Sequence, residues 1–292
     1  MRVAIGGSTG MIGTALARHL GRDGHEVVRL VRGAVTASDQ RHWDPDAGRI
    51  DGPGLEDVDA VVNLAGTPIA GARWTRERRA EIRRSRVTST LTVVTALSQG
   101  GRCQRLLNGS AVGFYGDTGT EIVDETMPAG RGFLADVVTD WEAAAAHSPV
   151  PTVLLRTGQV LSREGGLLGP QRPLFALGLG GRVGSGRQFM SWISLTDQLR
   201  AIAFLLGSDL TGPVNLVAPN PVSNAEFTQE FGRALHRPTP LPMPLTAVSA
   251  VFGRDLVNEL LLASQRVRPA RLLAAGFTFE HPTIAQALAA VA

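Results

Sequence analysis

Apolar residues follow two alternating patterns along the first half of this 292-residue chain. Short, continuous apolar runs are typical of strands buried on both faces of a sheet, whereas apolar residues three or four positions apart are typical of helices. Strands are predicted at 3–5, 26–31, 41–43 and 152–156, and within 58–66 and 106–116, where each strand ends in a polar turn; helices are predicted at 14–20, 76–99 and 133–147. Because helices or long crossovers follow the strands, we predict an α/β fold with a Rossmann-like, doubly wound parallel sheet.

The second half of the chain has a different composition. Glycine and proline become dense from Ser162 onward, and the prolines of 238–244 indicate a linker. We therefore predict a Rossmann domain over residues 1–161 and a smaller, mostly helical substrate lobe over residues 162–292. The apolar strand near 214–217 is expected to return to the first domain.

Helix-start signals divide the second half further. One helix is expected to begin within 192–197, with Thr196 or Asp197 near its N-cap. Ser223 and Glu226 have the spacing of a capping box, which predicts a second helix start. Two more helices are predicted at 256–265 and 283–291.

A glycine-rich turn joins the first strand to the first helix. Glycine permits positive φ and close approach of the backbone to a pyrophosphate, and the helix N-terminus that follows offers unpaired N–H groups and a positive dipole end. Since a strand precedes the turn and a second strand follows the helix, we interpret it as a dinucleotide site rather than a simple tight turn. The residues assigned to it are Gly7, Ser8, Thr9, Gly10, Met11 and Ile12, with Gly13 completing the spacing.

The end of the second strand predicts which dinucleotide binds. An NAD site of this kind has an acidic residue there to hold the ribose hydroxyls. This chain has Arg32 and no carboxylate at that end. A guanidinium suits a 2′-phosphate, so we predict NADP(H), the alternative being a solvated arginine. Asn63, at the polar end of the strand within 58–66, is interpreted as a residue that orients the cofactor, with a simple turn-former as the alternative.

Charge and composition exclude several partners. The net charge is only +3, and all 29 basic residues are arginine. The dense basic run at 73–86 is interrupted by Glu77 and Glu81, which indicates a solvated helix face rather than a nucleic-acid site. The apolar runs are shorter than the roughly 18 residues of a membrane span, and the chain begins directly with a strand and shows no signal peptide. We expect a cytoplasmic protein without nucleic-acid or membrane partners.

Other chemical motifs are missing. A single cysteine, Cys103, excludes an internal disulfide and a Cys-rich metal site, and the six histidines lack ligand spacing, so no metal is expected. The segment 184–188 lacks the spacing of a nucleophile elbow, which disfavours a hydrolase. No feature of the sequence indicates an oligomeric state.

Motifs over nearly the whole chain resemble the extended short-chain dehydrogenases/reductases. The shared motifs are the glycine turn, 63–66, Ser110 leading to Tyr115 and Gly116, and 155–158. More specific segments resemble one atypical branch, the epimerase-family proteins of unknown substrate, which are NAD-dependent epimerase/dehydratase-like and share a C-terminal segment. These segments are 73–75, 85–87, 141–144, 178–188, 192–193 and 264–277. The resemblance implies an NADP-type cofactor and a substrate lobe over a Rossmann sheet.

The resemblance also extends the predicted site. The residues it adds as cofactor-binding are Leu64, Ala65, Gly66, Glu81, Arg86 and Arg156. On sequence alone, Glu81 and Arg86 fit a surface helical pair equally well. Arg156 and the loop residues Arg182 and Arg187 further suggest a small, anionic substrate, the alternative for the last two being plain surface arginines.

The catalytic pair of the larger family is missing. That family uses a tyrosine and a lysine four residues on, with the lysine lowering the tyrosine pKa. This chain has no lysine, and Phe133 and Val137 stand where the pair belongs. Ser110 and Tyr115, at the exit of a strand, are the predicted replacement proton donors. For Tyr115 the favoured alternative is a packing residue of the family's Tyr-Gly turn.

Three hypotheses follow from this loss. The first is an oxidoreductase or epimerase-type enzyme that acts by hydride transfer on a small substrate with a different proton donor. The second is a non-catalytic NADP(H)-binding or redox-sensing protein. The third is a sugar-nucleotide epimerase, which is disfavoured because transient oxidation needs a base.

Overall fold

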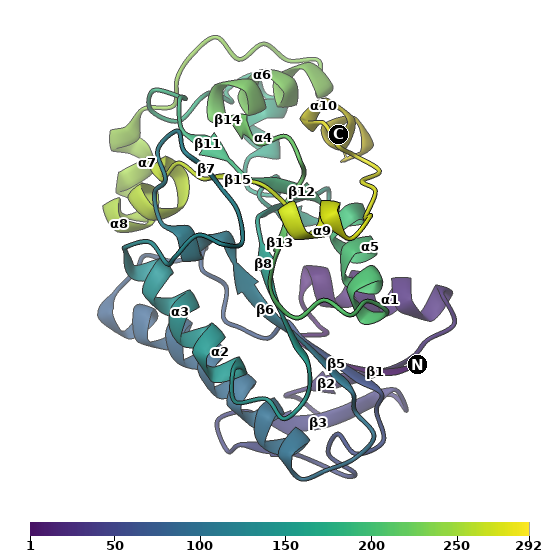
Figure 1. The fold of residues 1–292 in the computed structure, drawn as a ribbon. Coiled ribbons are helices and arrows are strands. Elements are labelled where there is room, and N and C mark those ends of the chain that lie inside the picture. The colour runs from purple at the N-terminus through teal and green to yellow at the C-terminus, as the bar shows by residue number, and fades with distance from the viewer. Residues whose placement is uncertain (292) are drawn as a thin grey trace.

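The structure is a computed structural model that describes residues 1–291. Its centre is an eight-stranded sheet of order β13-β8-β6-β5-β1-β2-β3-β4 (Figure 1). The strands are β1 (Arg2–Gly6), β2 (Glu26–Val31), β3 (Gln40–Asp44), β4 (Arg49–Ile50), β5 (Ala60–Asn63), β6 (Arg105–Ala111), β8 (Thr152–Thr157) and β13 (Gly212–Leu216). All neighbouring pairs are parallel except β3 with β4. The predicted Rossmann-like α/β fold is confirmed.

Helices cover both faces of this sheet. On one face α1 (Met11–Arg22) and α5 (Leu195–Leu206) share a core with Val3 and Ile5 of β1. On the other face α2 (Arg76–Ser98) packs on Ala4 of β1 and on Val61 of β5, with α3 (Phe133–Ala145) beside it (Figure 1). Alternate residues of β1 thus enter opposite cores, which is why the strand is apolar throughout.

The strand order reverses at β1, which has β2 on one side and β5 on the other. In open parallel sheets this switch point leaves a crevice at the carboxyl ends of the strands. The first glycine turn, Arg32 and the residues after Asn63 all follow those ends.

The second half contributes to both parts of the molecule. The strand predicted near 214–217 is β13, which pairs with β8, so its return to the main sheet is confirmed. α5 also packs on the sheet, against α1. The boundary predicted at 161/162 falls inside β9 (Gln159–Ser162).

The remaining elements build a smaller lobe over the carboxyl edge (Figure 1). It contains three small sheets: β9 with β10 (Gly165–Gly166) and β12 (Trp192–Ser194), β11 (Phe189–Met190) with β14 (Val222–Ser223), and β7 (Ile122–Val123) with β15 (Arg266–Val267). Its helices are α4 (Arg172–Ala176), α6 (Asn224–Ala234), α7 (Leu245–Phe252), α8 (Arg254–Leu256), α9 (Ala270–Ala274) and α10 (Ile284–Val291), with a 3-10 turn η1 (Val112–Tyr115) and a π-helical turn η2 (Val257–Leu262). Within residues 1–291, every helix is too short or too polar to cross a membrane.

Two of the predicted helix boundaries are corrected. Residues 192–194 form β12, parallel to β9, and the N-cap of α5 is Ser194, whose Oγ accepts a hydrogen bond from the Asp197 N–H. The predicted helix at 256–265 is split between α8 and η2 and ends at Leu262. The capping box of Ser223 and Glu226 is confirmed at the start of α6.

Candidate functional site

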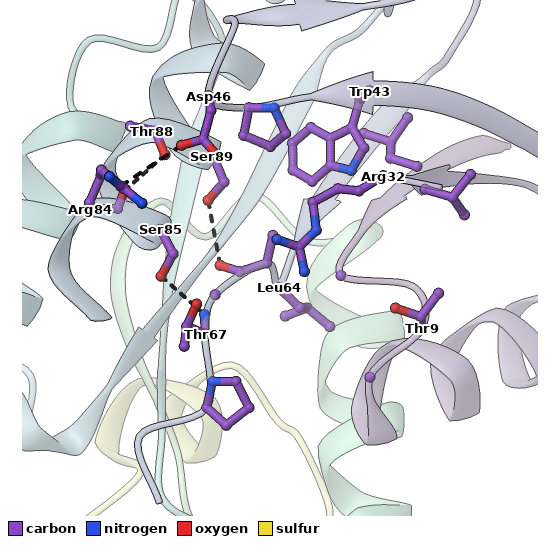
Figure 2. Close-up of a pocket in the computed structure, with 18 of the residues that line it drawn as sticks. Thr9, Arg32, Trp43, Asp46, Leu64, Thr67, Arg84, Ser85, Thr88 and Ser89 are labelled. Carbon is purple, nitrogen blue, oxygen red and sulfur yellow. Dashed lines mark hydrogen bonds and ion pairs between the residues drawn. The ribbon is translucent and has the colours of Figure 1, made fainter. Parts of the chain in front are cut away.

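A cavity of about 420 Å³ opens at the carboxyl ends of β1, β2 and β5. Figure 2 shows Thr9, Arg32 and Leu64 on one side of it and Ser85, Thr88 and Ser89 of α2 on the other. The volume is in the range of small-molecule and cofactor sites. Eight of the predicted cofactor residues line it: Gly7, Thr9, Gly10, Arg32, Leu64, Ala65, Gly66 and Glu81.

The glycines of the first turn have different physical roles. Gly7 has a φ of 74°, and a Cβ there would lie 2.7 Å from the carbonyl carbon of Leu64. A Cβ on Gly13 would lie 2.2 Å from the Gly7 carbonyl oxygen, so Gly13 lets α1 pack against the turn. A Cβ on Gly10 would meet only that same oxygen, at 3.4 Å. The protein itself does not require a glycine at position 10, whereas an approaching phosphate would.

The N-terminus of α1 is available to an anion. Its N-cap is Gly10, which carries no side-chain cap, so the first N–H groups of α1, including those of Met11 and Ile12, lack an intrahelical acceptor. The side chains of Met11 and Ile12 do not line the cavity: Met11 lies against Gly165, and Ile12 packs on the core beneath α1. A pyrophosphate fits this end of the helix.

Two buried residues shape the turn rather than the cavity surface. The Ser8 Oγ donates to the Leu30 carbonyl (3.1 Å), which ties the glycine turn to β2. The Asn63 side chain donates to Asn108 (2.9 Å) and accepts from the Ala65 N–H (3.3 Å). Asn63 thus holds the segment after β5 in place, which matches its turn-forming interpretation.

Arg86 joins the segment after β5, which lines the cavity, to α2. Its Nη1 donates to the carbonyls of Thr67 (3.0 Å) and Ile82 (3.0 Å), and its guanidinium carbon lies 5.1 Å from the ring centre of Trp141. Burial lowers the pKa of Arg86 to about 10. Arg86 is buried and its Nη1 donates to two backbone carbonyls, so it holds the segment after β5 in position. Its predicted contact with the cofactor stays a prediction.

Arg32 follows β2 directly and lines the cavity (Figure 2). It is exposed and forms no hydrogen bond or ion pair with the other residues of the described part of the chain. An unpaired guanidinium beside a helix N-terminus is suited to a phosphate. The residues present therefore fit a dinucleotide with a 2′-phosphate.

The α2 wall is polar and internally paired. Glu81 accepts from the Thr67 hydroxyl (3.1 Å) and from Arg78 (2.9 Å), and the hydrogen bond from Arg78 holds the pKa of Glu81 below its ordinary value. The Ser85 Oγ accepts from the Thr67 N–H (3.0 Å). These contacts join the turn after β5 to α2.

The sequence analysis missed most of the far wall. Its unpredicted members are Arg84, Ser85, Thr88 and Ser89 of α2, Trp43 of β3, and Pro45 and Asp46 after β3. A signal for the helical part exists, because polar residues recur three and four positions apart from Glu81 onward and mark one face of α2. The loop after β3 reaches the site through a contact between the Thr92 hydroxyl and the Pro45 carbonyl, which periodicity does not reveal.

Ser110, Tyr115 and Arg156 lie together in a buried network away from this cavity. Arg156 forms a two-pronged ion pair with Glu142 (both contacts 2.8 Å) and donates to the Tyr115 hydroxyl (3.0 Å). Ser110 donates to Glu142 (2.5 Å), and Tyr115 donates to Asn215 (2.8 Å). The network ties β6, β8 and β13 to α3.

This arrangement does not support two of the predicted roles. Burial raises the pKa of Tyr115, and its hydroxyl hydrogen is already held by Asn215. The Ser110 proton is similarly directed to a carboxylate. Arg156 donates to Glu142 and Tyr115, which gives it a structural role in this network, and its predicted contact with a cofactor or substrate stays a prediction.

The positions of the missing catalytic pair belong to an apolar cluster. Val137 is 1% exposed and packs with Trp74, Ile82 and Leu256 of the C-terminal segment. Phe133 is partly buried in the same cluster, with its ring centre 5.1 Å from that of Trp74. The backbone N–H groups at the start of α3 are covered by the Glu259 carboxylate, which accepts from Phe133 (3.1 Å) and Leu134 (2.8 Å).

Arg182 and Arg187 are exposed in the glycine-rich loops of the smaller lobe and do not line the cavity. Their predicted contact with an anionic substrate therefore stays a prediction.

Known proteins match this chain over its whole length. It is 51% identical over 290 residues to the epimerase family protein Mb2239 of Mycobacterium bovis, covering 98% of this chain and 96% of that protein. The crystal structure of human epimerase family protein SDR39U1 (isoform 2) with NADPH aligns at a TM-score of 0.93 and 37% identity, covering 100% of this chain and 99% of that one. A nucleoside-diphosphate sugar epimerase from Corynebacterium glutamicum aligns at 0.80 and 36% identity, over 99% of this chain and 57% of that one.

Family models divide the chain near the proline-rich segment. Residues 243–291 match a domain of unknown function, DUF1731, which corresponds to α7 through α10. Residues 3–216 match the NAD dependent epimerase/dehydratase family, a range that runs from β1 to the end of β13. This protein belongs to the NAD dependent epimerase/dehydratase family.

Proposed function

We propose that this protein binds NADP(H) in the cavity between the first glycine turn and α2. The observation that carries the proposal is Arg32, an unpaired guanidinium at the end of β2 where an NAD site has a carboxylate. The similar human protein was crystallised with NADPH, which supports the same choice.

Each part of the cavity matches one part of the nucleotide. The open N-terminus of α1 would receive the pyrophosphate, and the 2′-phosphate would lie on Arg32. The adenosine would lie between Trp43 at the end of β3 and the Ser85 face of α2. When bound, NADP(H) supplies or accepts a hydride.

The Arg32→Gln variant tests this assignment. Titration calorimetry with NADPH and NADH should show an NADPH affinity about tenfold weaker than that of the wild type, because a charge-assisted hydrogen bond is lost. NADH binding should change less than twofold. Equal losses of affinity for NADPH and NADH would show that Arg32 does not hold the 2′-phosphate.

The geometry supports nucleotide binding more strongly than the chemistry of the larger family. Val137 and Phe133 belong to an apolar cluster, and the protons of Ser110 and Tyr115 are held by buried acceptors. This favours the non-catalytic NADP(H)-binding or redox-sensing role over an oxidoreductase or epimerase with those two residues as proton donors.

An exchange assay separates the two roles. Stereospecifically labelled NADPH would be incubated with a panel of nucleotide sugars, carbonyl compounds and enones, and label transfer would be followed by mass spectrometry. The binding role predicts tight NADPH binding without transfer to any class. Transfer that survives in both Ser110→Ala and Tyr115→Phe would instead establish a hydride-transfer enzyme with another proton donor.

A further inference from the structure

Four arginines surround the cavity, and they differ in what their charges already contact. Arg78 is paired with Glu81 (2.9 Å) and donates to the Pro68 carbonyl (2.6 Å). Arg86 is buried, and its Nη1 donates to two backbone carbonyls. Two lining residues remain with charge available to a ligand, namely Arg32 and Arg84.

Among the described residues, the Arg84 side chain has a single ion-pair partner, and that pair is weak. Its Nε lies 3.9 Å from the Asp46 Oδ1, and the two side chains are 66% and 74% exposed. Ion pairs between such exposed side chains contribute little, because water screens them and both side chains lose freedom. Arg84 can therefore leave Asp46 at little cost when a stronger anion arrives.

A 2′-phosphate is such an anion. A phosphomonoester carries a charge between about −1.5 and −2 at neutral pH, so a single guanidinium leaves it incompletely neutralised. Figure 2 shows Arg84 beside Asp46 and Thr88 on the α2 side, with Arg32 reaching toward the cavity from the β2 side. The second lining carboxylate, Glu81, is already neutralised by Arg78.

We propose that Arg84 is a second specificity residue for the 2′-phosphate, and that in the free protein its guanidinium is weakly paired with Asp46. The inference rests on the proposed NADP(H) site and adds a residue that no sequence motif indicated. It follows that Asp46 opposes NADP(H) binding, because its carboxylate competes with the phosphate for the same guanidinium.

The experiment uses fragments that differ only in the phosphate of interest. Titration calorimetry would measure 2′,5′-ADP and 5′-AMP binding to the wild type, Arg84→Gln, Asp46→Asn and the double variant. Arg83→Gln is the matched control, since Arg83 lies on the same helix, pairs with Asp140 (3.1 Å) and does not line the cavity. Thermal unfolding would verify that each variant is folded.

Arg84→Gln should weaken 2′,5′-ADP binding about tenfold, as expected for a lost charge-assisted hydrogen bond, with 5′-AMP binding unchanged. Asp46→Asn should strengthen 2′,5′-ADP binding by roughly twofold to fivefold. In the Asp46→Asn background, Arg84→Gln should still cost most of the tenfold, and Arg83→Gln should have no effect.

Three results would overturn the assignment. If Arg84→Gln no longer weakens 2′,5′-ADP binding in the Asp46→Asn background, Arg84 acts only by neutralising the charge of Asp46 and does not contact the phosphate. If 5′-AMP weakens equally, Arg84 contacts the adenosine. If 2′,5′-ADP binds no better than 5′-AMP in the wild type, and Arg32→Gln changes neither, then the proposed NADP(H) site itself fails, which is distinguishable from a failure of Arg84 alone.

Discussion

Two glycines of the first turn, Gly13 and Gly10, should respond differently to substitution by alanine. Gly13→Ala places a Cβ 2.2 Å from the Gly7 carbonyl oxygen and 2.9 Å from the Ser8 Cα. Both contacts are with backbone atoms, so α1 must move away from the turn. Gly10→Ala places a Cβ 3.4 Å from the same oxygen, at a φ of −78° that any residue adopts. The first change strains the fold, whereas the second only fills space on the cavity surface.

The magnitudes follow from these contacts. Overpacking of this severity costs about 3 kcal/mol, which lowers the melting temperature of Gly13→Ala by roughly 6–12 °C. Gly10→Ala should change the free energy of unfolding by no more than about 0.5 kcal/mol. Its NADP⁺ affinity should nevertheless fall about tenfold, because the methyl group blocks the approach of the pyrophosphate to the backbone.

Calorimetric unfolding and NADP⁺ titration of the same preparations test this pair. Gly21→Ala is the control, since a Cβ there meets nothing within 4 Å and the exchange should stabilise α1 by about 0.5–1 kcal/mol. A folded Gly10→Ala that binds NADP⁺ as tightly as the wild type would refute the assignment of the turn to the pyrophosphate.

Three further predictions concern the buried side chains. The double variant Phe133→Tyr with Val137→Lys restores the tyrosine and lysine of the larger family. It should cost about 3–5 kcal/mol of stability and show no reductase activity, because the lysine ammonium enters an apolar cluster. A variant that is stable in chemical denaturation and active in NADPH oxidation would contradict this. Burial raises the pKa of Glu125, so the contribution of Glu125 to the free energy of unfolding falls as pH rises from about 4.5 through its folded-state pKa. Glu125→Gln should therefore raise the melting temperature at pH 7.5 but not at pH 4, and an equal effect at both would argue against a charged, buried Glu125. Glu142→Gln should cost about 3–5 kcal/mol in urea unfolding by leaving Arg156 buried without its partner, while NADP⁺ affinity stays unchanged; weakened binding would return the pair to the cofactor site.

Local patterns predicted the half of the site that lies close together in the chain. β1, the glycine turn and α1 are adjacent in sequence, and Arg32 follows the next strand, so propensity and spacing were sufficient. The wall built by Asp46 and Thr88 was missed because it depends on the loop after β3 packing on α2.

The direction of a polar side chain was the least predictable property. Arg156 follows the pattern of a strand end, and nothing in its local sequence distinguishes a cleft arginine from a buried one. Its direction is set by Glu142, fourteen residues away on α3, which supplies both acceptors. The hydrogen-bond partner of Tyr115 was likewise not predictable, because Asn215 is contributed by β13, 100 residues later.

The ratio of the NADH and NADPH dissociation constants of the wild-type protein tests the central claim most directly. Titration of both nucleotides at one ionic strength gives it in a single experiment. With the 2′-phosphate held by Arg32, NADPH should bind at least about tenfold more tightly than NADH. Equal affinities, or tighter binding of NADH, would contradict the account.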